Sequence, residues 1–403
     1  MKIIRFGELY SIPTSNGVSR PSAVRGEGFH MINMGELFSF DVINEMPMER
    51  VFLSDKEQKK YLVKKGDLLF ARQSLVAAGA GKCSIVNNIL EPTTFESHLI
   101  RVRLDETRCC PRYYYYLFKL PDNPIKTIVN QCAQAGIRGS ELQKIKVPLP
   151  MLAEQRRIAS ILSTYDNLIE NNNKRIRLLE QMAENLYKEW FVRFRFPGHE
   201  KAEFENGLPN GWRTETASNV VDVMSGGTPK TEREDFYGGD IPFYTPKDAD
   251  DSIFVYSTIT YITEEGLAHC NSQYYPVNTL MITARGTVGK LSLLAVPMAM
   301  NQSCFALKFK YNNHPYYLYY SIKNEVSKLK KMASGGVFDT IVVKTFDHIK
   351  ITVPSEEMLF AFDKVVTPLL EQIQHLQRQS NLLSRQRDLL LPRLMSGKLE
   401  VKV

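Results

Sequence analysis

Residues 150–195 read PMLAEQRRIASILSTYDNLIENNNKRIRLLEQMAENLYKEWFVRFR, the longest helical pattern in the chain. Apolar residues, or residues that a coiled-coil core tolerates, recur there at every seventh position. A second set with the same seven-residue step begins four residues later in the sequence. The first register holds Ile158, Tyr165, Asn172, Leu179 and Leu186, and the second holds Leu162, Ile169, Ile176, Ala183 and Trp190. The pattern predicts a long helix that pairs with another helix and ends before Pro197–Gly198.

Such a helix would extend roughly 60 Å at ~1.5 Å per residue, which is too long for the core helix of one domain. It is better explained as a spacer with a globular domain at each end, and 403 residues are enough for two or three folded units. We therefore expect a first globular domain at residues 1–150, the central long helix at 151–196, a linker and second globular domain at 197–354, and a distal long helix with a C-terminal tail at 355–403.

The distal helix carries its own seven-residue step, at Phe362, Leu369, Leu376, Leu383 and Leu390. Pro368 either kinks this helix or marks the start of its regular part. We expect the two long helices to pair antiparallel as a coiled coil. Asn172 then either fixes the register of pairing, with a partner such as Ser380, or belongs to a polar and partly exposed middle.

Internal repetition decides the fold class. One constant spacing carries Tyr113, Tyr115 and Tyr116 onto Tyr317, Tyr319 and Tyr320, and Ile145–Lys146 onto Ile349–Lys350. With small insertions, Leu68–Phe70 matches Leu280–Ile282, Ala71–Arg72 matches Ala284–Arg285, Gly81–Lys82 matches Gly289–Lys290, and Ala135–Ile137 matches Gly335–Val337. The sequence thus predicts an α+β protein with two mixed α/β globular domains, two long antiparallel helices and a pseudo-twofold internal repeat.

Local patterns predict the elements of these domains. Short β-prone runs indicate strands at residues 61–63, 67–71, 99–104, 145–150, 279–283 and 304–309. A short helix is expected at 113–118, after Pro111, and a loop at 196–211.

Composition restricts the function classes. The net charge of +7 and the pI near 8.9 favour an anionic partner, although an ordinary solvated surface explains them as well. The N-terminus does not resemble a signal peptide and nothing reaches the length of a membrane span, so we expect a cytoplasmic protein. The six cysteines form no CxxC pair, which predicts reduced structural thiols and no metal site.

The glycine loop Gly79–Ser84 invites a phosphate-loop interpretation, which fails because Val76 stands where that motif needs glycine. Its repeat copy also lacks a hydroxyl residue after Lys290. Two interpretations remain: a glycine turn with Lys82 or Lys290 that approaches a DNA phosphate, or a tight hairpin with the lysine in solvent.

Arg72 and Arg285 are placed by the repeat at matching ends of a buried strand, where an arginine can reach a base edge or a phosphate, or pair internally with a residue such as Asp67. Weaker DNA-binding candidates lie in loops beside glycines: Gln73, Arg138, Lys230, Lys247 and Lys344. Catalytic patterns such as HExxH, GxSxG, GxGxxG and Asn-Pro-Pro-Tyr do not occur in the sequence.

Three stretches carry a resemblance to a known family. The helix opening at Pro150 and running to Phe191, the Leu208–Trp212 segment with Gly226–Lys230 behind it, and the tail at Leu389–Leu399 resemble the specificity (S) subunits of type I restriction-modification systems. The likeness covers essentially the whole chain.

This resemblance implies a non-catalytic DNA-reading subunit. Each globular domain would be a target recognition domain that reads one half of a bipartite double-stranded DNA target, and the helices would set the gap. Two methyltransferase (M) subunits would bind the helices, and ATP-dependent restriction (R) subunits could join, so that S-adenosylmethionine and ATP belong to partners and no cofactor belongs to this chain. Closure of the repeat would depend on the C-terminal tail returning toward residues 1–10. Two other interpretations stay open: a self-contained DNA methyltransferase or nuclease, and a scaffold that joins two protein-binding domains.

Overall fold

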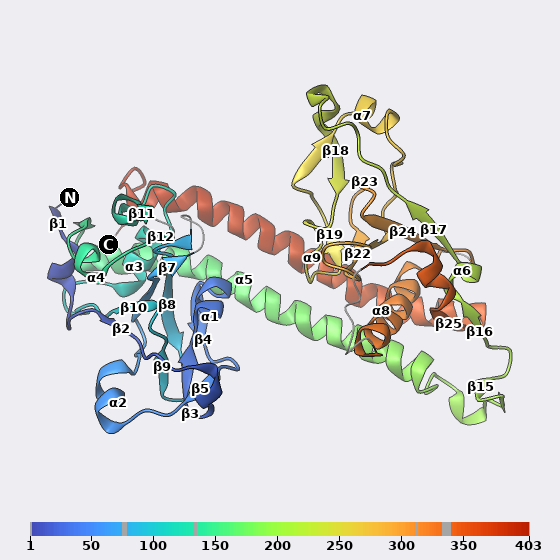
Figure 1. Cartoon of the computed structure of the whole chain (residues 1–403), viewed down its shortest axis with the longest axis horizontal. Helices are drawn as coiled ribbons and strands as arrows, with labels where there is room; N and C mark the ends of the chain where they lie inside the picture. The colour runs from blue at the N-terminus through green and yellow to red at the C-terminus, as the bar shows by residue number, and fades with distance from the viewer. Residues whose placement is uncertain (1, 75–78, 132–134, 312, 333–339, 403) are drawn as a thin grey trace. The chain divides into compact units, whose positions relative to one another are not determined.

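The computed structural model describes residues 2–74, 79–131, 135–311, 313–332 and 340–402 (Figure 1). The chain divides into two compact units. Unit 1 comprises residues 1–170 together with 380–403, and unit 2 comprises residues 171–379. Residues 380–403 therefore belong to the same unit as residues 1–170.

Unit 1 is built on a five-stranded sheet with the order β2 (Ser15–Asn16), β10 (Leu99–Val102), β6 (Leu68–Ala71), β8 (Cys83–Asn88) and β4 (Val42–Asn44). Only β4 runs parallel to its neighbour among these described pairs. Three smaller sheets complete the unit: β5 (Glu49–Val51), β3 (Arg25–Ile32) and β9 (Thr93–Phe95); β11 (Asn130–Gln131), β12 (Ala135–Gly136) and β7 (Gln73–Ser74); and β1 (Lys2–Arg5) with β13 (Lys146–Leu149).

Unit 2 repeats this topology. Its five-stranded sheet has the order β17 (Val221–Ser225), β24 (Cys304–Phe309), β21 (Leu280–Thr283), β22 (Leu291–Leu294) and β19 (Phe254–Val255). Beside it lie β20 (Thr260–Ile262), β18 (Tyr237–Tyr244) and β23 (Ala299–Met300), and β16 (Arg213–Thr216) with β25 (Lys350–Val353). Order and direction match strand by strand in the two five-stranded sheets, in the two three-stranded sheets built on β3 and β18, and in the pairs β1–β13 and β16–β25, which confirms the internal repeat at the level of the fold.

The shorter helices follow the same repeat where both units have them. Unit 1 holds α1 (Met34–Ser39), α2 (Asp55–Tyr61), α3 (Pro111–Leu117) and α4 (Gly139–Leu142), and unit 2 holds α6 (Ala217–Val220), α7 (Glu264–Ala268) and α8 (Pro315–Met332). The predicted tyrosine helix is α3, whose four tyrosines are all buried, and α8 is its counterpart.

The two predicted long helices are α5 (Leu152–Tyr187), which continues as a π-helix over Lys188–Val192, and α9 (Glu356–Met395). In unit 2 they are antiparallel, because Asn172 of α5 lies beside Gln379 of α9 while the Trp190 ring lies 5.8 Å from the Phe362 ring. In unit 1 the other halves of these helices cover α3, with Ile158 of α5 and Leu394 of α9 in one core.

The residues predicted to pair the helices lie on the inner faces to different degrees. Buried ones are Ile158, Leu162, Asn172, Ile176, Phe362 and Leu376, and half-buried ones are Tyr165, Ile169, Leu179, Leu186, Leu369, Leu383 and Leu390. The amide of Asn172 is 4% exposed and donates a hydrogen bond of 3.0 Å to Gln379, one residue before Ser380. Further buried residues that the heptad step missed are Leu359, Val366, Leu370, Ile373, Leu391 and Leu394.

Two local predictions were wrong. Tyr61 was expected in a strand but ends α2, because the Glu57 carboxylate accepts hydrogen bonds from the backbone and hydroxyl of Ser54 and so starts a helix just before it. The predicted loop at 196–211 contains a hairpin of β14 (Phe204–Glu205) and β15 (Leu208–Pro209), which turns at Asn206–Gly207 with φ of 51° and 80°. In addition, α9 starts at Glu356, so Pro368 does not mark the start of that helix.

Candidate nucleic-acid interface

The two five-stranded sheets present equivalent edges. In unit 2, β17 and β21 end at the edge where β19, β22 and β24 begin, as the pairings of Thr283 with Cys304 and of Ile282 with Leu291 show. In unit 1, β6 ends at the same edge where β4, β8 and β10 begin. We call the loops that emerge there, with the segments hydrogen-bonded to them, the loop edge: the described residues 17–20, 72–74, 79–82, 96–98 and 137–138 in unit 1, and residues 226–230, 245–253, 284–290, 301–303 and 341–344 in unit 2.

The loop edge of unit 1 brings three predicted residues together. Arg72 and Gln73 follow β6, and the carbonyl of Arg72 accepts a hydrogen bond of 2.9 Å from the amide of Ile137. Arg138 is the next residue and is exposed. Arg72, Gln73 and Arg138 therefore lie on two backbone segments that are hydrogen-bonded to each other.

The loop edge of unit 2 gathers the other exposed candidates. Arg285 lies next to Ala284, whose carbonyl accepts a hydrogen bond of 2.9 Å from Ile341, and Lys344 follows three residues further on. The hydroxyl of Thr287 donates to the carbonyl of Pro246 at 3.3 Å, which places Lys247 beside the same loop. These three cations come from three separate segments of the chain.

Lys230 reaches the same edge from the loop after β17. The hydroxyl of Thr228, two residues before it, is hydrogen-bonded to the amide oxygen of Gln302. Ser303, the residue after Gln302, accepts a hydrogen bond of 2.8 Å from the amide of Ala284, so the Lys230 loop and the Arg285 loop share a neighbour. The side chain of Lys230 is exposed.

The two repeat lysines both lie beside an aspartate. Lys82 Nζ donates to the carbonyl of Phe38 and lies 3.6 Å from the Asp41 carboxylate, and Lys290 Nζ lies 2.6 Å from Asp251. Burial lowers the pKa of Lys82, while Asp41 opposes this effect. Burial raises the pKa of Asp41, but Lys119 and Lys82 outweigh it, and the net shift is downward. The positive charges of Lys82 and Lys290 are therefore partly compensated by the neighbouring carboxylates of Asp41 and Asp251.

The predicted equivalence of Arg72 and Arg285 is wrong by one residue. The amide of Arg72 donates to the carbonyl of His98, and the matching hydrogen bond in unit 2 runs from Ala284 to Ser303, both at 2.8 Å. Arg72 thus corresponds to Ala284, and Gln73 corresponds to Arg285. Aligning the dipeptides Ala71–Arg72 and Ala284–Arg285 by their identity gave the wrong match. Structural equivalence follows the strand register, which pairs Arg72 with Ala284.

Two further expectations concern the same strands. The alternative in which Arg72 forms an internal ion pair with Asp67 is wrong. The Asp67 carboxylate instead accepts two hydrogen bonds from Arg103, at 2.7 and 2.6 Å. The proposed match of Ala135–Ile137 with Gly335–Val337 falls on residues 335–337, which lie outside the described part of the chain.

Sequence reasoning missed two exposed polar residues of the loop edges. His98, with its side chain 53% exposed, stands directly before β10, and Gln302 occupies the turn before β24. A signal was available, since each lies in a turn and precedes a strong β-prone run. Both lie within one residue of the backbone bonds that position Arg72 and Ala284.

A group of potential metal ligands lies in unit 1, away from these candidates. His30 is buried between Glu45, at 3.4 Å, and Glu91, at 3.9 Å. Glu91 also pairs with Arg50 at 2.7 Å, so a cation bound here would have to displace a guanidinium. The described contacts place a buried histidine beside an ion pair of Glu91 with Arg50. Among the residues that the structure describes, no helix is long and apolar enough to cross a membrane.

Comparisons with known proteins agree with this architecture. The family model for the type I restriction modification DNA specificity domain matches residues 32–181 and again 209–383. The MjaIX specificity subunit of a type I restriction enzyme from Methanocaldococcus jannaschii is 27% identical over 300 residues, covering 72% of this chain and 69% of that protein. The HindI specificity subunit from Haemophilus influenzae is 24% identical over 411 residues, covering 85% and 88%.

Among solved structures, the S subunit of a type I restriction-modification system from M. genitalium matches with a TM-score of 0.60 at 18% identity, covering 98% of this chain and 95% of that chain. This similarity concerns the fold. The family match falls once on each unit and covers most of the chain. The protein belongs to the family of type I restriction modification DNA specificity domains and carries two copies of that domain.

Proposed function

We propose that this chain is the DNA-reading specificity subunit of a type I restriction-modification assembly, and that each unit reads one half of a bipartite target through its loop edge. The observation that carries the proposal is the repetition of the loop edge, with exposed or half-buried cations from separate loops in both units. Cations held on loops around a rigid sheet can contact phosphates and base edges.

The two loop edges carry different side chains, which suits an asymmetric target. Unit 1 offers Arg72, Gln73 and Arg138, whereas unit 2 offers Arg285, Lys247, Lys230 and Lys344. Arginine and glutamine form bidentate hydrogen bonds to guanine and adenine, and lysine binds phosphate as a point charge. We infer that Arg72, Gln73, Arg138 and Arg285 contribute base readout and that the lysines, with Lys82 and Lys290 in a minor role, position the DNA backbone.

Catalysis belongs to partner subunits in this proposal. The relatives are named specificity subunits of type I restriction enzymes, which implies other subunits in those enzymes. We propose that two methyltransferase subunits bind this chain and that ATP-dependent restriction subunits join them in the cytoplasm. S-adenosylmethionine and ATP would then be bound by the partners.

We propose that α5 and α9 set the gap between the half-sites. The boundary between the units falls inside both helices, between residues 170 and 171 and between 379 and 380. Inserting one heptad at this boundary in both helices should lengthen the gap and leave each half-site unchanged. If the lengthened protein still recognised half-sites with the original gap, α5 and α9 would not set that gap.

The central experiment maps methylated sites after reconstitution with the methyltransferase subunits. Arg138→Ala should relax or weaken recognition of one half-site, and Arg285→Ala should do so at the other, each by about 1–3 kcal/mol of discrimination. Lys201→Ala removes the same charge from the exposed linker segment before β14 and serves as the control.

Three outcomes would contradict the proposal. Arg138→Ala and Arg285→Ala could affect the same half-site, they could leave both half-sites intact, or the control could match them. Methyl transfer by the purified chain alone, with labelled S-adenosylmethionine, would also oppose a non-catalytic role.

A further inference from the structure

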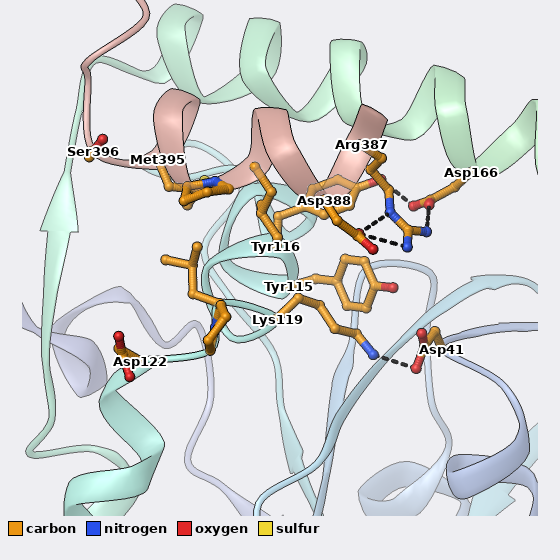
Figure 2. A pocket seen from close by; sticks show the side chains of 14 residues that line it. Asp41, Tyr115, Tyr116, Lys119, Asp122, Asp166, Arg387, Asp388, Met395 and Ser396 are labelled. Carbon is orange, nitrogen blue, oxygen red and sulfur yellow. Dashed lines mark hydrogen bonds and ion pairs between the residues drawn. The ribbon is translucent and has the colours of Figure 1, made fainter. Parts of the chain in front are cut away.

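Unit 1 contains a cavity of about 690 Å³ between the end of α3 and the last turns of α9. Figure 2 shows the arrangement: Lys119 reaches toward Asp41, and Arg387 lies between Asp166 and Asp388. The guanidinium of Arg387 donates hydrogen bonds of 2.8 Å to Asp166 and 3.0 Å to Asp388. The cavity has the size of a pocket that holds a drug-sized ligand.

The internal repeat shows what this position holds in unit 2. Tyr116 and Lys119 of unit 1 correspond to Tyr320 and Lys323, and Leu391 corresponds to Tyr187. In unit 2 the Tyr187 ring stacks on the Tyr320 ring, with centroids 6.0 Å apart and planes 26° apart, and Tyr187 is only 6% exposed. An aromatic ring therefore fills the space beside the equivalent tyrosine.

Unit 1 replaces these aromatic residues with aliphatic ones. Leu391 stands where Tyr187 stands, Leu394 where Trp190 stands, and Met395 where Phe191 stands. Tyr116, Leu391 and Met395 all line the cavity. A leucine side chain is shorter than a tyrosine ring, so Leu391 fills less of the space beside Tyr116 than Tyr187 fills beside Tyr320, and the cavity lies at this place.

A salt bridge between two helices of unit 2 is also absent from the corresponding pair of residues in unit 1, each of which has another partner. Lys323 Nζ lies 2.7 Å from the Glu184 carboxylate, which joins α8 to α5. The corresponding pair in unit 1 is Lys119 and Asp388, but Lys119 binds Asp41 and Asp388 binds Arg387. The end of α3 is thus not tied across the cavity to α9 by that pair.

The lining is acidic, in a chain that carries a net charge of +7. Four carboxylates face two cations, which are already held in ion pairs: Asp41, Asp122, Asp166 and Asp388 against Lys119 and Arg387. The side chain of Asp388 is 62% exposed and remains accessible to an incoming cation, whereas Asp41 already lies beside two lysines, Lys119 and Lys82. Such a lining repels DNA phosphate and favours a positively charged ligand.

We propose that this cavity binds an aromatic side chain flanked by lysine or arginine, presented by a protein that assembles with this chain. The ring takes the place beside Tyr116 that Tyr187 takes beside Tyr320. The flanking cation lies against Asp388. This inference goes beyond the proposed reading of DNA and does not depend on it.

The test titrates the full chain, labelled at methionine methyl groups, with the peptide acetyl-Lys-Tyr-Lys-amide and follows the NMR signals. The Met395 methyl should shift in a saturable way, while the methyl of Met281, buried in unit 2, should not. Acetyl-Lys-Ala-Lys-amide tests the need for the ring, and acetyl-Glu-Tyr-Glu-amide tests the need for the cations. Both should bind markedly more weakly.

Two variants make the test specific. Leu391→Tyr supplies the ring that unit 2 has and should abolish the response of the Met395 methyl without lowering the thermal stability of the chain. Asp388→Asn, an exposed change that leaves the core intact, should weaken the peptide roughly threefold, whereas Glu203→Gln in an exposed loop should leave it unchanged.

The proposal is overturned if the Met395 methyl does not respond, or if the alanine or glutamate peptide binds as well. It is also overturned if Leu391→Tyr still binds the peptide, or if free p-cresol binds as tightly, which would assign the cavity to small aromatic molecules. The measurement contains no DNA, so its failure leaves the proposed function standing.

Discussion

Units 1 and 2 share a topology but stabilise it with different chemistry. At the start of the central strand, unit 1 has Asp67 bound to Arg103, whereas unit 2 has Thr279, whose hydroxyl donates to the carbonyl of Pro276. Around the tyrosine helix, unit 2 uses Tyr187, while unit 1 has Leu391. The comparison teaches that strand register is what the repeat preserves, because polar and aromatic contacts can be exchanged within it.

The ionic network of unit 1 gives the largest expected effect. Asp67 is fully buried, and Asp67→Asn would leave Arg103, 21% exposed, without its charged partner. We expect a loss of about 3 kcal/mol in the free energy of unfolding. Urea denaturation, with hydrogen exchange read separately in β6 and β21, measures it and should locate the loss in unit 1.

The matched control transplants the residues of unit 2. Asp67→Thr, Arg101→Ala and Arg103→Lys together reproduce Thr279, Ala306 and Lys308 at the equivalent positions. This triple variant should recover part of the stability lost by Asp67→Asn. If Asp67→Asn is as stable as the parent protein, the contact of Asp67 with Arg103 does not stabilise unit 1. The difference between the two units at this position would then not affect stability.

The aromatic cluster of unit 2 gives an intermediate effect. Tyr187→Leu would introduce there the residue found in unit 1, and the lost contacts with Tyr317 and Tyr320 should cost about 2 kcal/mol. Tyr311→Leu, at a tyrosine that is 43% exposed in the same unit, is the control and should cost less. Equal losses in urea denaturation would show that burial of the Tyr187 ring does not matter.

The helix caps give the smallest effect, and it depends on pH. Hydrogen bonds from Ser54, together with Arg20, lower the pKa of Glu57 from 4.5 to about 2. Because the folded pKa is depressed, the stabilisation of α2 is complete above pH 4.5 and is lost as the pH falls toward 2. The equivalent α7 is capped by the neutral hydroxyl of Thr263, which accepts from Gly266 at 3.0 Å.

Hydrogen exchange at several pH values checks this difference. Exchange in α2 should accelerate, relative to α7, between pH 4.5 and 2, and Glu57→Gln should remove the pH dependence. Identical pH profiles for the two helices would contradict the assignment of the cap to Glu57.

Periodic patterns predicted the parts of the fold that depend on local apolar spacing. The strands at β6, β21 and β24 and the helix α3 followed from short runs such as Leu68–Ala71, and α5 from its heptads. Tyr61 was misplaced because a cap at Ser54 outweighs a β-prone tripeptide. The β14–β15 hairpin was missed although Asn206–Gly207 is a strong turn signal.

The candidate DNA-binding residues could be chosen from sequence, but their grouping could not. Lys230, Lys247 and Arg285 are distant along the chain; the ends of β17 and β21 share an edge, and the hydrogen bond from Thr287 to Pro246 brings the Lys247 loop to it. The pairing of Lys82 with Asp41 was equally hidden, since it joins residues on separate loops. Side-chain periodicity reports which face is buried, and it carries no information on which loops converge.

The division of unit 1 between the two ends of the chain constrains the order of folding during synthesis. Ile158 and Leu162 are buried with Leu391 and Leu394, which are synthesised after every residue of unit 2, whereas unit 2 is one continuous stretch. Unit 2 can therefore complete its core first, while the larger part of unit 1 waits with an apolar face uncovered. This reverses the usual N-terminal-first order and exposes the nascent first unit to aggregation and chaperones until the residues of the second half of α9 have been made.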